Sequence, residues 1–266
     1  MTNPVVHTRI KKVTAAGITD TEDVLAAEEP LEIRLEHGPT HNRRQQNIAV
    51  TMRTPGQDAE LATGFLFTEG IIPGPDAIKQ VVLAETPDGS LATVSLKEQI
   101  IPFLDKSQRH FQATAACGMC GKSSIENIHT GVNVNQSARR TPGTWISQLP
   151  QQLRAQQALF RHTGGLHAAA LVDDDGQIQL LREDIGRHNA VDKIIGAALA
   201  QQFPLQQSLL LLSGRAGFEL IQKAAMAGIP MIAAIGAPSS MAVRMADQWN
   251  ITLIGFLKED RYNQYT

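Results

Sequence analysis

The chain has 266 residues, of which 42% are hydrophobic and 19% are charged, and its formal net charge is −2 at pH 7. This composition is typical of a soluble globular protein, and it provides no overall basic field for nucleic acid or an anionic membrane. No apolar run of about 18 residues predicts a transmembrane helix, and residues 1–30 lack the apolar core of a signal peptide. We therefore expect a cytoplasmic protein with neither nucleic acid nor membrane as a partner.

The first part of the chain predicts a small α+β unit. Residues 1–30 are polar and predict little structure beyond a short strand near Val5 and Val6. Apolar residues at helical spacing predict a helix with Asp58 as its N-cap and Gly70 as its C-terminal stop. Four segments have the pattern of strands, and the last two form a hairpin. These strands cover residues 31–35, 48–52, 78–85 and 91–96.

The rest of the chain predicts helices that alternate with strands. Helices are expected over residues 123–129, 146–161 (broken near Pro150), 190–200, 218–227 and 239–249. Strands are expected over residues 167–172, 177–181, 208–212, 230–235 and 251–257. The helix over residues 190–200 has an amphipathic pattern. This order predicts a three-layer α/β/α sandwich, and we place the boundary between a smaller N-terminal subdomain, 1–115, and this domain, 116–266.

The two cysteines of the chain, Cys117 and Cys120, form a lone Cys-x-x-Cys motif. Zinc needs further ligands at suitable spacing, which the histidines do not offer, so no metal site is predicted. A redox dithiol is an alternative, although the preceding Gly/Ala-rich stretch is a poor strand. Two buried structural thiols are another. A helix start just beyond Cys117, with Lys122 nearby, favours a thiolate that carries sulfur as a persulfide.

Several segments together resemble the formate dehydrogenase accessory sulfurtransferase (FdhD) family. They are LATGFLFTEG (61–70), CGMC (117–120), TGGLHAA (163–169), REDIGRHNAVDK (182–193), SGRAGFEL (213–220) and APSS (237–240). The resemblance runs in order from about residue 30 to the C-terminus, and its longest block is highly specific. It implies a cytidine deaminase-like fold for the sandwich.

The same resemblance implies a sulfur carrier. A cysteine desulfurase would load sulfur onto Cys117, and Cys120 would act as a second thiol that resolves or relays it. The recipient would be the bis-molybdopterin guanine dinucleotide cofactor, before its insertion into a molybdenum-dependent formate dehydrogenase. A delivery chaperone that binds the cofactor without using its cysteines is the alternative, and the apolar second half is compatible with a homodimer.

Two segments are candidates for binding the guanine nucleotide part of that cofactor, because ligands of open α/β sheets gather beyond the carboxyl ends of the strands. Gly214 and Arg215 follow a buried strand and precede a helix, where a phosphate would meet backbone N–H groups and a guanidinium. The family resemblance adds the second segment, which consists of Phe256, Leu257, Lys258, Glu259, Asp260 and Arg261.

Individual roles within these segments are left open. Family members often carry Arg-Gly where this chain has Lys258 and Glu259, which keeps the charge but loses a bidentate fork. His167 and His188 would either line the pocket or serve as hydrogen-bonded structural residues.

Overall fold

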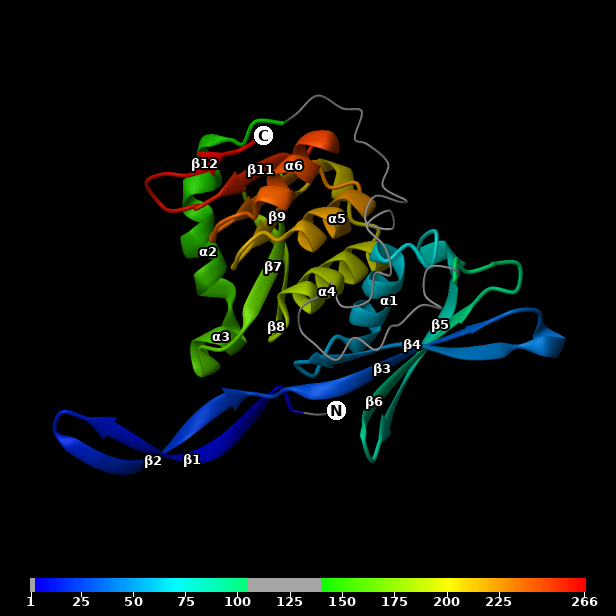
Figure 1. Ribbon diagram of the computed structural model, residues 1–266, viewed down its shortest axis with the longest axis horizontal. Helices are drawn as coiled ribbons and strands as arrows, with labels where there is room; N and C mark the ends of the chain where they lie inside the picture. The colour runs from blue at the N-terminus through cyan, green and yellow to red at the C-terminus, as the bar shows by residue number, and fades with distance from the viewer. Residues whose placement is uncertain (1–2, 105–139) are drawn as a thin grey trace.

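The computed structural model describes residues 3–104 and 140–266, and the strands in these ranges form three sheets (Figure 1). A two-stranded hairpin projects from the molecule, a four-stranded sheet belongs to the N-terminal part, and a six-stranded sheet forms the centre of the second part. The proposed boundary at residue 115 lies outside the described residues. No helix of the described residues is long and apolar enough to cross a membrane.

The projecting hairpin corrects the expectation of a weakly structured N-terminus. Strands β1 (Val5–Thr14) and β2 (Gly17–Ala26) pair in antiparallel register along their whole length. β-branched residues recur along both strands and favour extended backbone. Neither face of the hairpin packs on the core, so its residues are largely polar. This polarity is why the sequence of residues 1–30 predicted little structure. Val13 and Ile18 pair at the tip of the hairpin and remain 71% and 67% exposed.

The four-stranded sheet has the order β4-β3-β6-β5 and confirms the strands predicted in this part. Its strands are β3 (Glu29–His37), β4 (Arg44–Arg53), β5 (Ile78–Thr86) and β6 (Gly89–Leu96). One face of β3 places Leu31, Ile33 and Leu35 in a core shared with helix α1 (Asp58–Thr68). The sheet therefore needs α1 to bury its apolar face.

The start of α1 differs from the prediction that Asp58 is its N-cap. Gln57 occupies that place in left-handed backbone, with φ of 55°, and Asp58 is the first helical residue. The Asp58 carboxylate instead accepts two hydrogen bonds of 2.9 Å from the buried Arg53 guanidinium. The predicted stop at Gly70 is confirmed, since its φ of +70° suits glycine just after a helix.

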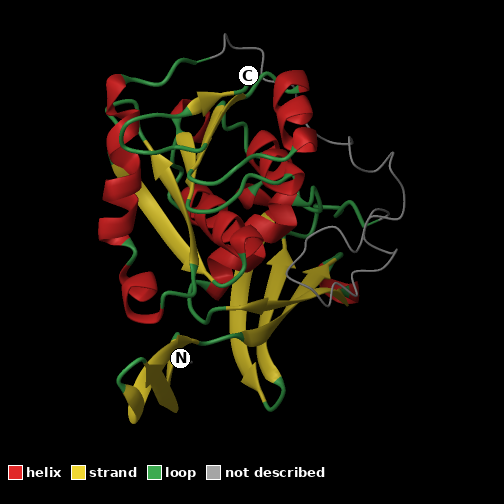
Figure 2. Cartoon of the chain, turned by 60° about the vertical axis from the view of Figure 1, so that its left-hand side comes forward, coloured by secondary structure: helices red, strands yellow, loops and turns green. Residues whose placement is uncertain are grey.

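The second part confirms the three-layer sandwich (Figure 2). The sheet order is β12-β11-β10-β9-β7-β8. Its strands are β7 (His167–Val172), β8 (Ile178–Asp184), β9 (Leu209–Leu212), β10 (Met231–Ala234), β11 (Thr252–Gly255) and β12 (Asn263–Gln264). β9, β10 and β11 are parallel, whereas β7 runs antiparallel to β8 and β9. The likeness to the cytidine deaminase fold stays a prediction.

Helices cover both faces of this sheet. Helix α2 (Leu149–Gln156) packs on one face, and α3 (Ala158–Thr163) follows it; α4 (Arg187–Ala200), α5 (Phe218–Met226) and α6 (Ser240–Gln248) cover the other face. The predicted cap of α6 is confirmed, since the Ser239 side chain accepts a hydrogen bond of 3.1 Å from Ala242 N. The predicted break near Pro150 is present, since a 3-10 helix over Thr144–Gln148 ends where α2 begins with Pro150 in its first turn. A second break, which was not predicted, lies at Gln157.

Helix α4 is present as predicted, but it has no solvent face. It lies between the six-stranded sheet and α1, and nearly all of its residues are buried. Its polar residues pair with groups from both parts of the chain. Asp192 accepts a hydrogen bond of 2.7 Å from Thr68 Oγ1 and forms an ion pair of 2.9 Å with Lys223. The amphipathic pattern therefore reflects two kinds of buried contact. The apolar residues of α4 pack in the core of the six-stranded sheet, and its polar residues bond to buried polar partners.

Candidate functional site

The candidate site is the edge of the six-stranded sheet at which β8, β9, β10 and β11 end, which we call the carboxyl edge. The loops at this edge are residues 185–186, 213–217, 235–239 and 256–261, and β7 begins there with His167. β8 and β9 both run antiparallel to β7, so they share one direction with β10 and β11. The two sequence-predicted segments thus lie on the same edge.

A third loop, residues 235–239, bonds to both of these segments and was missed by the sequence prediction. Gly236 N donates a hydrogen bond of 3.0 Å to Gly214 O, and Phe256 N donates one of 3.1 Å to Gly236 O. A Cβ at Gly236 would lie 2.9 Å from Arg215 N, so the two loops approach too closely for a side chain. Because Gly236 follows the middle one of three buried strands, strand order could have identified it.

The residues of the segment that follows β11 differ in burial and in backbone conformation. Leu257 is fully buried and packs in the core beneath the edge, whereas Phe256 is 45% exposed. Phe256 also has a φ of 52°, a left-handed backbone that non-glycine residues rarely adopt and that tends to occur at functional sites. Lys258 N donates a hydrogen bond of 2.8 Å to Arg261 O, which closes an exposed turn.

The remaining charged groups of that turn are also exposed. Arg261 forms an ion pair of 3.3 Å with Asp260, and Glu259 is exposed as well. Their charges are screened by solvent, so a single ionic contact made by this turn would be weak.

Cationic and helix-terminal groups make the carboxyl edge suitable for an anion. Arg215 is exposed, and Arg187 begins α4. Helices α4 and α5 both start here behind glycine N-caps that provide no side-chain hydrogen bond. Their first N–H groups and the positive ends of their dipoles favour phosphate.

The two histidines considered in the sequence both lie at this edge. Burial and the nearby charges of Arg187, His188 and Arg215 lower the pKa of His167, while Asp184 opposes the shift. His188 is buried, and its Nε2 lies 2.8 Å from Glu219 Oε2. Glu219, which the sequence prediction missed, stands in the first turn of α5.

The turn between β8 and α4 is held by a buried carboxylate. Asp184 forms an ion pair of 2.7 Å with Lys193, and both side chains are fully buried. Asp184 also accepts hydrogen bonds from Gly186 N at 2.8 Å, Asn189 Nδ2 at 3.0 Å and Thr54 N at 3.2 Å. Since Thr54 follows β4, the N-terminal part helps to shape the carboxyl edge.

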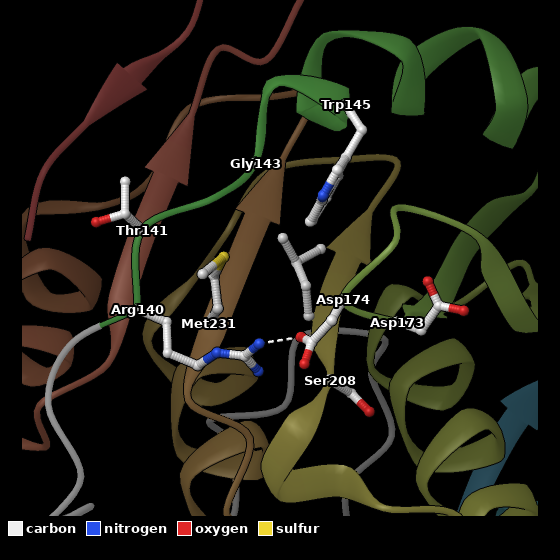
Figure 3. A pocket seen from close by; sticks show the side chains of 9 residues that line it. Arg140, Thr141, Gly143, Trp145, Asp173, Asp174, Ser208 and Met231 are labelled. Atoms are coloured by element: carbon white, nitrogen blue, oxygen red, sulfur yellow. Dashed lines mark hydrogen bonds and ion pairs between the residues drawn. The ribbon is translucent and has the colours of Figure 1, made fainter.

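A small hollow lies at the opposite end of the sheet, beside the first residues of β9 and β10 (Figure 3). Its volume is about 210 Å³, and Arg140, Trp145 and Asp174 are among the residues that line it. Arg140 and Asp174 already form an ion pair with each other across it. It contains none of the predicted site residues and is smaller than the roughly 300 Å³ of typical ligand pockets.

Cys117 and Cys120 lie outside the described residues, as does the helix predicted over residues 123–129. Within residues 3–104 and 140–266, no group of three or more His, Cys, Asp or Glu side chains is arranged to hold a metal ion. The described part of the site is therefore the carboxyl edge.

Comparisons with known proteins agree over nearly the whole chain. A profile of the FdhD/NarQ family matches residues 26–266. A protein of Mycolicibacterium paratuberculosis is 43% identical over 97% of this chain and 95% of its own length. A protein of Streptomyces coelicolor is 42% identical over 97% of this chain and 92% of its own length. Both relatives are described as sulfur carrier protein FdhD.

A solved structure shows the same fold. It is a crystal structure from Desulfotalea psychrophila, described as that of a formate dehydrogenase accessory protein, with a TM-score of 0.76 and 23% identity. The superposition covers 99% of this chain and 97% of that one. The family profile and the two relatives establish that the chain belongs to the FdhD/NarQ family.

Proposed function

We propose that this protein is a cytoplasmic sulfurtransferase that carries sulfur as a persulfide on Cys117 for the maturation of a formate dehydrogenase. The observation that carries the proposal is the nearly full-length similarity to proteins described as sulfur carriers. The lone cysteine pair supports it, because Cys117 and Cys120 are the two thiols in the chain.

The loading step is an exchange between two sulfur–sulfur bonds. The Cys117 thiolate attacks the outer sulfur of a persulfide on a cysteine desulfurase. A new S–S bond forms on Cys117, the S–S bond of the desulfurase breaks, and the desulfurase cysteine leaves as a thiolate. In the release step, the Cys120 thiolate attacks the inner sulfur of Cys117. The outer sulfur leaves as hydrosulfide, the two cysteines are oxidised to a disulfide, and a thiol reductant restores them.

The proposed recipient of that sulfur is the bis-molybdopterin guanine dinucleotide cofactor, bound as a substrate at the carboxyl edge. The fit is supported by Arg215 and Lys258, which suit phosphate, and by the uncapped starts of α4 and α5. The exposed Phe256 ring offers a face on which a guanine base can stack.

Maturation of a formate dehydrogenase in cells that lack their own FdhD-type protein tests this function. Complementation with Cys117→Ala is expected to abolish formate dehydrogenase activity, because no persulfide can form. Met119→Ala, between the two cysteines, serves as the matched control and is expected to keep activity. Arg215→Ala is expected to reduce activity by weakening the hold on the cofactor phosphate.

The alternative function is a delivery chaperone that binds the cofactor and uses no thiol. The carboxyl edge favours this alternative, because its cations and helix starts would bind the phosphates of the cofactor without any thiol chemistry. Full activity with Cys117→Ala, combined with lost activity for Arg215→Ala, would replace the sulfur-carrier function with this one.

A further inference from the structure

Strand β5 forms an open edge of the four-stranded sheet. It is the last strand in the order β4-β3-β6-β5, and among the described strands it pairs with β6 alone. None of its nine residues is buried, and Val82 and Leu83 are 48% and 51% exposed. A long strand edge with exposed apolar side chains is a template for pairing with a strand of another chain, and proteins usually shorten or cover such edges. The features of β5 are therefore those of an interaction surface.

The sequence of β5 is complementary to itself. Residues 79–85 read KQVVLAE, so Lys79 and Glu85 are equally far from Val82 and carry opposite charges. When two copies of β5 pair in antiparallel direction about a two-fold axis at Val82, Lys79 of each copy comes opposite Glu85 of the other. Val81 comes opposite Leu83 in the same way, also twice. Moving the centre by one residue in either direction separates both charge pairs, so the charges specify a single register.

The ends of this stretch are compatible with that register. The pairing of β5 with β6 shifts between Ile78 and Gln80, so the side chain of Lys79 does not follow the regular alternation of the strand. Its flexible stem lets the ammonium group reach a carboxylate that lies opposite or diagonally across the pair. Beyond the stretch, Asp76 comes opposite Asp88 of the second copy. Both are exposed, so solvent screens their repulsion.

We propose that two copies of this chain associate through β5, by antiparallel pairing centred on Val82. The two four-stranded sheets then form one continuous sheet across the two-fold axis. Main-chain hydrogen bonds provide the attraction, and the two Lys79–Glu85 pairs determine the register. A pairing of this length is a small interface, so the dimer forms reversibly and its amount depends on protein concentration. The inference is independent of the sulfur-carrier function.

Sedimentation velocity of the full chain over a series of concentrations tests the proposal by charge reversal. Lys79→Glu and Glu85→Lys are each expected to weaken the dimer about 5- to 100-fold, because two attractive pairs become repulsive. The double variant Lys79→Glu/Glu85→Lys is expected to recover the wild-type affinity, since each pair again joins opposite charges. An equimolar mixture of the two single variants is expected to form heterodimers, in which every charge again meets its opposite.

Lys12→Glu, which reverses an exposed lysine on the projecting hairpin, is the control and is expected to dimerise like the wild type. Circular dichroism of each variant verifies that it is folded. A wild type that stays monomeric at about 100 μM would overturn the proposal. A dimer that neither single reversal weakens would also overturn it, because its interface must then lie elsewhere. Weakening by both single variants without recovery in the double variant would refute the register centred on Val82.

Discussion

At the scale of single residues, the REDIGRHNAVDK block is chiefly a set of buried partners. Asp184 and Lys193 form a fully buried ion pair, and Lys193 Nζ also donates a hydrogen bond of 2.8 Å to Thr54 O. A buried pair of this kind gives little net stability compared with apolar residues. Substituting only one residue of the pair is costly, because the other charge then stays buried without its partner.

We expect Lys193→Met to lower the free energy of unfolding by about 3–5 kcal/mol, since Asp184 would keep its charge in a dry surrounding without its cation. Urea unfolding followed by circular dichroism measures the change. The control is Arg34→Met, which removes the ion pair with Glu32. Those side chains are 29% and 30% exposed, and we expect a loss below about 1 kcal/mol. A similar small loss for Lys193→Met would contradict the role given to the buried pair.

His167 provides a prediction on pH. Its pKa lies below the ordinary value of 6.5, through burial first and then through the neighbouring cations. The unfolded chain therefore binds more protons than the folded chain at pH values just below 6.5. Stability from the neutral ring is fully present above that value and is lost as the pH falls through it.

His167→Gln should make the free energy of unfolding fall less than that of the wild type between about pH 7.5 and pH 5.5. Urea unfolding at both pH values gives the two differences directly. Equal differences in wild type and variant would show that His167 titrates alike in the folded and unfolded chain.

At the scale of elements, the close crossing of α1 and α4 joins the two parts of the chain. A Cβ on Gly64 would lie 1.9 Å from Asp192 O, and one on Gly196 would lie 1.9 Å from Glu60 O. The two helices therefore contact each other through backbone, and glycine is required at both positions.

Either Gly64→Ala or Gly196→Ala is expected to cost about 1–3 kcal/mol, toward the upper end, because the added methyl group meets backbone that cannot rotate away. Gly74→Ala is the matched control, since a Cβ there meets nothing within 4 Å, and it should change stability by less than about 0.5 kcal/mol. Thermal and urea unfolding measure all three. Neutral behaviour of both helix variants would mean that the helices are not in backbone contact.

The sequence predicted elements well wherever local periodicity carries the information. The strands around Leu31 and Leu210 and the helices that became α1, α5 and α6 follow from spacing alone. The packing of α4 could not be predicted in this way. Asp192 and Lys193 look like a solvent-exposed face, and only the position of α1 shows that they are buried.

Part of the candidate site could be predicted from the sequence. Arg215 lies where its strand ends and Phe256 belongs to the segment that the family resemblance implied, so both could be proposed before the structure was known. Glu219 could not, because its role depends on a contact of 2.8 Å with His188, which is 31 residues away in sequence. The roles of Cys117 and Cys120 stay predictions.

At the scale of the whole molecule, the two parts of the chain share their buried polar groups. Thr54 and Thr68 from the N-terminal part bond to Asp184 and Asp192 of the second part. These bonds tie the carboxyl edge to the N-terminal part, which is the kind of support that a preorganised binding site needs. The cysteine motif supplies the chemistry in our account, and the edge supplies the hold on the cofactor.

The central claim is that Cys117 carries sulfur, and intact mass spectrometry after incubation with a cysteine desulfurase and cysteine tests it most directly. We expect the wild type to gain at least one sulfur, Cys117→Ala to gain none, and Cys120→Ala to load and retain its sulfur because the resolving thiol is missing. A Cys117→Ala protein that gains sulfur as the wild type does, or a wild type that gains none, would contradict the account.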